Sequence, residues 1–218
     1  MGGFRPGDVV RVKDGSLSPE VTAQCSGGWQ GRVREILHDY DGEETVVIEL
    51  DSVSLRSMSP SLLYESWMSY EDCLTLELPP GDIETASPRD AEEDVTAAAE
   101  EVKRAVELLE RAKQDVPPAF YQLWEDYLKR VVTFPFEAEV CECTAHHPFR
   151  EGDRVEVRAI DSADDYYGLI AEVWDGRDKF YFPLCGLKPC DAAEATQTAV
   201  EEYREWFNRY GRYEAGDA

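Results

Sequence analysis

Four short segments in the second half of the chain decide the fold: FPFEAEV (134–140), GDRVEV (152–157), DSADDYYGLIAEV (161–173) and FYFPLCGLK (180–188). Apolar and polar residues alternate over much of these segments, and Gly, Asp and Pro separate one segment from the next. This pattern predicts short antiparallel strands that curl into a small barrel or a strongly bent sheet. A tight hairpin is predicted at Trp174-Asp175-Gly176-Arg177, because Asp-Gly tolerates the positive φ angles of a primed turn.

Three carboxylates lie close together in the connection Asp161-Ser162-Ala163-Asp164-Asp165. We expect this connection to be a loop between a strand that ends at Ile160 and a strand that begins near Tyr166. Such a cluster repels itself unless it is well solvated or holds a cation. Calcium takes six to eight oxygen ligands at roughly 2.3–2.6 Å, and aspartate oxygens of this kind suit it. The spacing of the aspartates differs from that of an EF-hand loop.

Two further carboxylates, Glu137 and Glu139, are two residues apart on a predicted strand. Side chains at this spacing point to the same face of a strand, so both could meet the acidic loop or Glu142 across a neighbouring strand. The alternative is that all these carboxylates form a solvated face of a very acidic protein.

The composition restricts the partners. The chain has 218 residues, with 46 acidic and 22 basic side chains and a formal net charge of -24. This charge argues against binding to nucleic acid and against docking on an anionic membrane. We find no apolar run of about 18 residues, the length needed to span a bilayer. The first residues lack the apolar core of a signal peptide, so the sequence predicts a cytoplasmic protein.

The six cysteines show no C-x-x-C pair, and in a chain of this kind they are expected to be reduced, small apolar residues. A zinc site is the alternative, since Cys141, Cys143, His146 and His147 are close in sequence. Their spacing matches no standard structural zinc motif.

Residues 1–80 read as an all-β domain of the SH3-like barrel kind, with period-2 strands between turn residues. The segment GDVVRV (7–12) has a near copy in GDRVEV (152–157), which is consistent with a duplicated barrel. Trp67, Tyr70 and the segment CLTLEL (73–78) read as the closing strand of this barrel. Trp67 and Tyr70 either seal the core or form an aromatic platform for a protein partner.

Residues 81–116 are predicted to form a helical linker. Within it, residues 88–114 have a narrow apolar stripe with a seven-residue repeat, which fits a spacer or a homodimeric coiled coil. Residues 117–218 form the last predicted domain. Two amphipathic helices flank its strands, one around Trp124 and one around Trp206. The expected fold class is therefore α+β, with two small SH3-like barrels joined by a long helix.

An enzyme is not predicted. The three histidines have no Ser or Cys nucleophile in a recognisable elbow, and the sequence lacks a Walker or Rossmann phosphate loop.

The helix that carries Trp124 and Tyr127, followed by FPFEAEV (134–140), resembles the cyanobacterial calcium-binding CcbP family. GDRV (152–155), DDYYGLI (164–170) and FPLC (182–185), ahead of a last helix with Trp206, resemble it too. The resemblance covers about residues 117–210. It implies a small, acidic, β-rich cytosolic protein that binds Ca2+ through carboxylates without an EF-hand.

The residues expected to ligate calcium are Asp161, Asp164, Asp165, Glu137 and Glu139. The chain departs from the family after the Pro-Leu-Cys run, where relatives tend to carry an acid and this chain has Gly186 and Lys188. This departure would remove a ligand or weaken a site.

The sequence thus leads to a calcium buffer or sensor. The alternatives are an SH3-like interaction adaptor, whose acidity serves solubility or attraction of a basic partner, and a decoy that imitates the charge of DNA.

Overall fold

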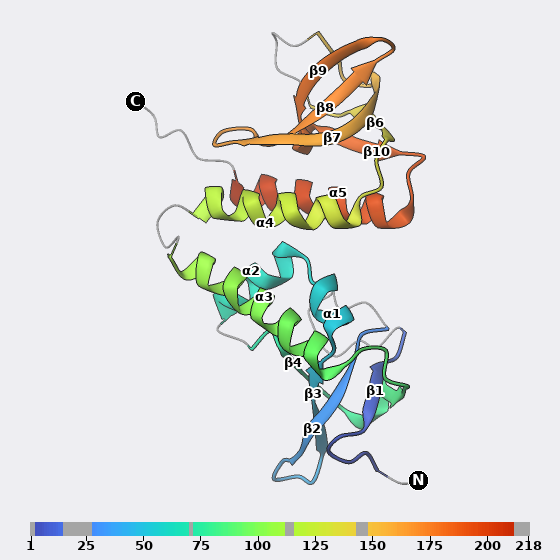
Figure 1. The fold of residues 1–218 in the computed structure, drawn as a ribbon, viewed down its shortest axis with the longest axis vertical. Helices are drawn as coiled ribbons and strands as arrows, with labels where there is room; N and C mark the ends of the chain where they lie inside the picture. The colour runs from blue at the N-terminus through green and yellow to red at the C-terminus, as the bar shows by residue number, and fades with distance from the viewer. Residues whose placement is uncertain (1–2, 15–27, 70–71, 112–115, 143–147, 212–218) are drawn as a thin grey trace. The chain divides into compact units, whose positions relative to one another are not determined.

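The computed structural model describes residues 3–14, 28–69, 72–111, 116–142 and 148–211. The chain divides into two compact units, residues 1–58 with 62–110 and residues 59–61 with 111–218. Each unit contains one five-stranded antiparallel sheet together with helices (Figure 1). The fold is therefore α+β, as the sequence predicts.

The sheet of the first unit has the strand order β4-β3-β2-β1-β5. Its strands are β1 (Val9–Val12), β2 (Gln30–His38), β3 (Glu44–Leu50), β4 (Thr75–Leu78) and β5 (Ile83–Thr85). Helices α1 (Ser52–Ser57) and α2 (Pro60–Ser69) connect β3 to β4, and a 3-10 turn, η1 (Pro80–Asp82), precedes β5. A long helix, α3 (Glu92–Arg111), follows β5.

Helices α1 and α2 were not predicted from the sequence. Trp67 lies on α2 rather than in the closing strand, Tyr70 lies outside the described residues, and the end of the predicted segment, Thr75–Leu78, forms strand β4. The start of α1 is fixed by Asp51, whose carboxylate accepts a hydrogen bond from Ser54 N at 2.7 Å. An aspartate in this position satisfies an amide that the first helical turn leaves unpaired.

The sheet of the second unit has the order β10-β6-β7-β8-β9. Its strands are β6 (Phe136–Val140), β7 (Arg154–Asp164), β8 (Gly168–Asp175), β9 (Asp178–Pro183) and β10 (Leu187–Cys190). A 3-10 turn, η2 (Leu184–Gly186), precedes β10. Helix α4 (Val116–Val131) comes before the sheet and α5 (Glu194–Trp206) comes after it, continuing into a π-helical turn, η3 (Phe207–Gly211).

The two sheets have the same topology. In each, the last strand pairs with the first, and the other three follow in chain order. The predicted closed barrels are not confirmed. Among the described strands, β4 does not pair with β5 and β9 does not pair with β10.

The near copies GDVVRV (7–12) and GDRVEV (152–157) form the same turn at different places in the two sheets. Arg5 N donates to Asp8 Oδ2 at 2.8 Å, and Arg150 N donates to Asp153 Oδ2 at 2.7 Å. The first turn leads into β1, the first strand of its sheet, whereas the second leads into β7, the second strand of its sheet. The repeated sequence therefore encodes a local turn and does not align the two sheets strand for strand.

Aromatic side chains of α4 and α5 form the core of the second unit on one side of the sheet, where the two helices run side by side (Figure 1). Phe120 stacks on Trp206 with 5.0 Å between ring centroids, and Trp124 meets Tyr203 edge-on at 5.3 Å. Each such pair contributes about 0.5–1.5 kcal/mol beyond the area it buries. The amphipathic pattern predicted both helices because these aromatic residues recur at helical spacing.

The predicted apolar stripe of α3 is largely buried, with Ala98 and Leu109 fully enclosed and Val102 and Ala105 nearly so. The stripe is thus used within this chain. In the part of the chain that the structure describes, no helix is long and apolar enough to cross a membrane.

Candidate calcium site and a cavity in the first unit

The acidic segment predicted as a loop forms the end of a β-hairpin. Strand β7 continues to Asp164 because Ser162 pairs with Ile170, Ala163 with Leu169 and Asp164 with Gly168. Only Asp165, Tyr166 and Tyr167 connect β7 to β8. The prediction that the strand ends at Ile160 was wrong, since pairing with β8 carries the backbone past the aspartates.

Asp164 closes the connection between the strands. Its Oδ1 accepts hydrogen bonds from Tyr166 N at 2.8 Å and Tyr167 N at 3.0 Å. An aspartate that bonds the backbone two and three residues onward stabilises a turn of this kind. One oxygen of Asp164 is therefore already used inside the protein.

The first residues of β8 are held by α5. Gly168 has φ +68°, and a Cβ there would clash with the Tyr203 hydroxyl oxygen. The next residue, Leu169, donates its backbone N–H to the same hydroxyl at 2.7 Å. Leu169 and Tyr203 are both fully buried. Burial raises the pKa of Tyr203 well above its ordinary value, so the hydroxyl is neutral.

The aspartates of the hairpin differ in exposure. Asp161 and Asp165 are exposed, while Asp164 is half-buried. Asp161 lies where the pairing of β7 with β8 shifts register, between Ile160 and Ser162. An irregularity of this kind changes the direction of the side chains next to it. The three carboxylates thus come from a bulge, a strand end and a turn.

Glu137 and Glu139 share the outer face of β6, as their spacing predicts. Strand register places Glu137 opposite Glu156 and Glu139 opposite Arg154. Glu156 and Asp161 are five residues apart along β7, roughly 16 Å at ~3.3 Å per residue. The two glutamates therefore lie away from the hairpin end.

Basic side chains surround these two glutamates. Arg154 Nη1 lies 3.7 Å from Glu137 Oε2 and 3.9 Å from an oxygen of Asp191, and Lys188 is the strand partner of Glu139. The outer face of β6 therefore carries charges of both signs, and its carboxylates are partly balanced by guanidinium and ammonium groups.

Gly186 lies where a side chain has little space. A Cβ on Gly186 would lie 2.9 Å from Glu142 O and 2.9 Å from Phe182 Cε1. Contacts below 3.0 Å to backbone force the surroundings to shift, so this site has no room for an acidic side chain. Lys188, two residues later, is exposed.

A calcium ion requires several oxygen donors that converge on one point. Within the described ranges, no group of three or more His, Cys, Asp or Glu side chains is close enough to hold a metal. The hairpin nevertheless offers hard oxygen donors that are open to solvent, which is the ligand type calcium prefers. An ion held there would take much of its coordination from water and backbone carbonyls, because the described side chains form no preformed cage.

The predicted cysteine and histidine cluster is only partly visible. Cys143, His146 and His147 lie outside the described residues. Cys141 is half-buried, and its thiol lies 3.6 Å from Glu139 O. The zinc alternative stays a prediction.

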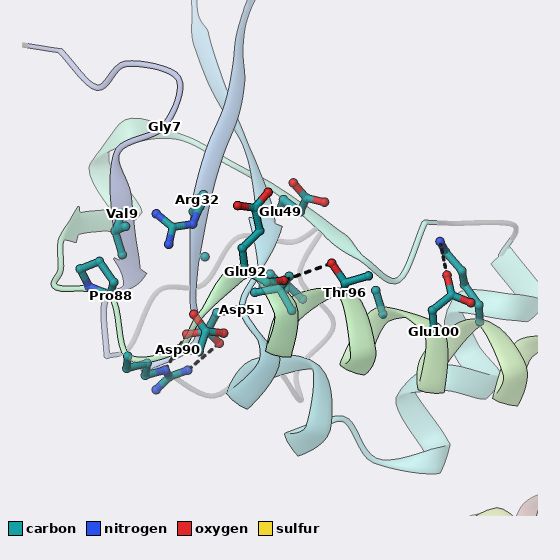
Figure 2. Close-up of a pocket in the computed structure, with 16 residues that line it drawn as sticks. Gly7, Val9, Arg32, Glu49, Asp51, Pro88, Asp90, Glu92, Thr96 and Glu100 are labelled. Carbon is teal, nitrogen blue, oxygen red and sulfur yellow. Dashed lines mark hydrogen bonds and ion pairs between the residues drawn. The ribbon is translucent and has the colours of Figure 1, made fainter.

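The first unit contains a cavity of about 600 Å³ (Figure 2). Arg32 and Glu49 line it from the strands, and Glu92, Thr96 and Ala99 line it from α3. No sequence pattern indicated this cavity, because the apolar stripe over residues 88–114 predicts only a spacer or a coiled coil.

A partly buried ion pair, in which Asp51 is buried and Arg89 is about one third exposed, lies in the wall of the cavity. The Asp51 side chain is 8% exposed and receives two hydrogen bonds from Arg89, Nε to Oδ2 at 2.6 Å and Nη2 to Oδ1 at 3.0 Å. Asp90 Oδ2 accepts from Ser52 N at 2.6 Å. These bonds attach the segment before α3 to the start of α1. With charges of both signs on its walls, the cavity selects no single class of ligand.

Comparison with known proteins concerns the second unit. Residues 120–207 match the model of the CcbP family, which is described as calcium binding. The crystal structure of Anabaena CcbP is similar at 20% identity and a TM-score of 0.39, covering 51% of this chain and 94% of that one. A calcium binding protein in the calcium-binding form is similar at 21% identity and a TM-score of 0.38, covering 47% of this chain and 85% of that one.

No curated protein matches the chain. The C-terminal region, residues 120–207, is CcbP-like, as the sequence resemblance implied. The description of the matched family names calcium binding and no catalytic activity.

Proposed function

We propose that the second unit binds Ca2+ through the carboxylates at the end of the β7–β8 hairpin, Asp161, Asp164 and Asp165, and acts as a calcium buffer or sensor. The observation that carries the proposal is the match of residues 120–207 to a calcium-binding family. The hairpin supports it, because Asp161, Asp164 and Asp165 lie within five residues of one another in sequence and none of them is buried.

The residues of the chain have distinct parts in this proposal. Asp161 and Asp165 would supply exposed carboxylate oxygens, while Asp164 would supply one oxygen and keep the other on the amides of Tyr166 and Tyr167. A bound calcium ion would neutralise the repulsion among these carboxylates. Because the described side chains form no cage, we expect weak to moderate affinity, since the ion must order its own ligands.

Glu137 and Glu139 are not included in this site. Their place beside Arg154 and Lys188 gives them cationic neighbours within the protein. Replacing these two glutamates instead provides a control, because it lowers the net negative charge of the chain without changing the hairpin.

The test is calorimetric titration of the full chain with CaCl2 in about 0.1 M KCl, which screens diffuse attraction. The double variant Asp164→Asn with Asp165→Asn removes two negative charges, and the amide oxygen introduced at position 164 can still accept from the two turn amides. Glu137→Gln with Glu139→Gln removes the same charge from β6. We expect defined stoichiometry in the wild-type chain, at least a tenfold loss of affinity in the hairpin variant and little change in the β6 variant.

Two results would contradict the proposal. Uptake that stays non-stoichiometric and falls steeply with salt indicates an acidic surface without a site. Equal losses in the two double variants indicate that net charge, rather than the hairpin, attracts the ion.

The interaction adaptor is kept as a second candidate for the first unit, because this unit contains the cavity between its strands and α3. A homodimer through residues 88–114 is a less favoured form of this idea, since the apolar stripe of α3 is already buried in the single chain. Sedimentation equilibrium of the full chain tests the dimer, and a monomer at micromolar concentration would exclude it.

A further inference from the structure

The hydrogen bond between α5 and the start of β8 constrains the hairpin. Asp164 pairs with Gly168, and the next residue, Leu169, gives its N–H to the Tyr203 hydroxyl at 2.7 Å. Gly168 has no space for a side chain, because Tyr203 and Phe207 occupy the position of its Cβ. The backbone opposite the acidic strand end is therefore seated directly against α5 and its π-helical continuation.

Tyr203 is also part of the aromatic core. Its ring lies 5.3 Å from that of Trp124 and 6.1 Å from that of Phe207, measured between centroids. Movement of the hairpin end must therefore either break the Leu169–Tyr203 bond or displace Tyr203 within a closely packed cluster. Packed cores of this kind resist small continuous shifts.

We propose that Tyr203 is a positioning residue for the calcium site, and that its hydroxyl couples calcium binding at the hairpin to the packing of α5. The inference rests on the proposed function. Coupling between two sites is reciprocal. Calcium bound at the hairpin should therefore strengthen the hydrogen bond from Leu169 N to the Tyr203 hydroxyl, and loss of this bond should weaken calcium binding.

Tyr121 provides a matched control in the same core. It is 1% exposed, lies 6.2 Å from Phe207 between ring centroids, and also makes one hydrogen bond to backbone, donating to Gly211 O at 3.0 Å. Burial, with smaller contributions from Cys185 and from the charges of Asp165 and Asp164, raises its pKa to about 12, so it too is neutral. Tyr121 therefore lies within electrostatic range of the same carboxylates, and the two variants differ mainly in the lost hydrogen bond. Its hydroxyl bond does not involve the hairpin backbone.

The experiment compares Tyr203→Phe with Tyr121→Phe in the full chain, by calcium titration and by amide hydrogen exchange. Each variant loses one buried hydroxyl and one hydrogen bond, and keeps its ring. We expect Tyr203→Phe to weaken calcium binding roughly three- to tenfold, the effect of one neutral hydrogen bond, and Tyr121→Phe to change it less than about twofold. The Leu169 amide should exchange faster in Tyr203→Phe only.

A second measurement needs no variant, and it decides the matter if Tyr203→Phe folds poorly. Calcium added to the wild-type chain should slow exchange of the Leu169 amide more than that of the Val140 amide, which bonds Asp153 O at the other end of the sheet. Equal calcium affinity in the two variants, or equal slowing at Leu169 and Val140, overturns the inference alone. A wild-type chain that binds no calcium overturns the proposed function and the inference together.

Discussion

Asp51 is a buried carboxylate that connects two segments of the first unit. It caps α1 through Ser54 N and receives a bidentate pair from Arg89, although its side chain is only 8% exposed. Burial by itself would raise the pKa of Asp51, but the hydrogen bonds from Arg89 and Ser54 outweigh it and hold the pKa below its ordinary value. The ionised form is thus stabilised by folding.

Replacing Asp51 with Asn keeps an oxygen for Ser54 and removes the charge that pairs with Arg89. We expect a loss of about 2 kcal/mol in the free energy of unfolding of the first unit at pH 7, as for charge-assisted hydrogen bonds. Urea denaturation measures it. The control is Glu84→Gln, which removes the exposed partner of Arg11 and should destabilise the unit much less, because exposed ion pairs contribute little.

The pH dependence of the same pair has a definite sign. Because folding lowers the pKa of Asp51, its contribution is fully present above the ordinary aspartate pKa of about 3.9 and is lost as the pH falls through the folded value. The stability gap between wild type and Asp51→Asn should therefore be constant above about pH 5 and narrow below about pH 4. A gap that widens in acid would contradict this account.

Strand β8 begins at Gly168 and is followed by Gly176, and both glycines have positive φ, +68° and +60°. They differ in their surroundings: a Cβ at Gly168 would strike Tyr203 and Phe207, whereas a Cβ at Gly176 meets nothing within 4 Å. Gly176→Ala should cost about 1 kcal/mol for the left-handed backbone alone. Gly168→Ala should cost roughly 3 kcal/mol, because overpacking of the core adds to that strain.

Urea denaturation of the two glycine variants, monitored by the unfolding of the second unit, separates the cost of the left-handed backbone from the cost of overpacking the core. Equal losses at the two positions would mean that the seat of β8 on α5 contributes little. A larger loss of stability at Gly168 would show that the contact between β8 and Tyr203 stabilises the unit. The stability of Tyr203→Phe can then be compared with that of Gly168→Ala.

The same hairpin illustrates how far the sequence alone reaches. Alternation and helical spacing identified the strands around Val155 and Val173 and the helices around Trp124 and Trp206, because burial imposes these periods. The extent of β7 was misjudged, since pairing with Ile170 and Leu169 overrides the weak strand preference of Asp and Ala. Which glutamates face Arg154 depends on register, and residue types by themselves do not encode register.

Helices α1 and α2 were missed for a related reason. The segment from Ser52 to Ser69 has a weak apolar pattern, and its helical start depends on Asp51 being held by Arg89, 38 residues later. A contact between segments so far apart in sequence leaves no local signature. The CcbP-like motifs, in contrast, are local strings of residues, and so the resemblance of the second unit was visible in advance.

The whole molecule combines a net charge of -24 with a candidate site in only one of its two units. Its described ion pairs are mostly exposed, and exposed pairs contribute little each. Repulsion among the remaining carboxylates acts on both units, so simple salt should stabilise both by screening. A calcium site would stabilise only the unit that holds it.

Hydrogen exchange at matched ionic strength distinguishes these effects. We expect CaCl2, compared with KCl, to slow exchange across residues 148–211 and to leave residues 28–58 of the first unit unchanged, because binding stabilises a folded unit by about 2.7 kcal/mol at a hundred times Kd. MgCl2 is the control: Mg2+ keeps its water and demands stricter geometry, so it should protect less. If CaCl2 slows exchange equally in both units, or if Ca2+ and Mg2+ slow it equally, calcium acts only by screening charge. Screening of this kind does not require carboxylate oxygens that converge at the hairpin.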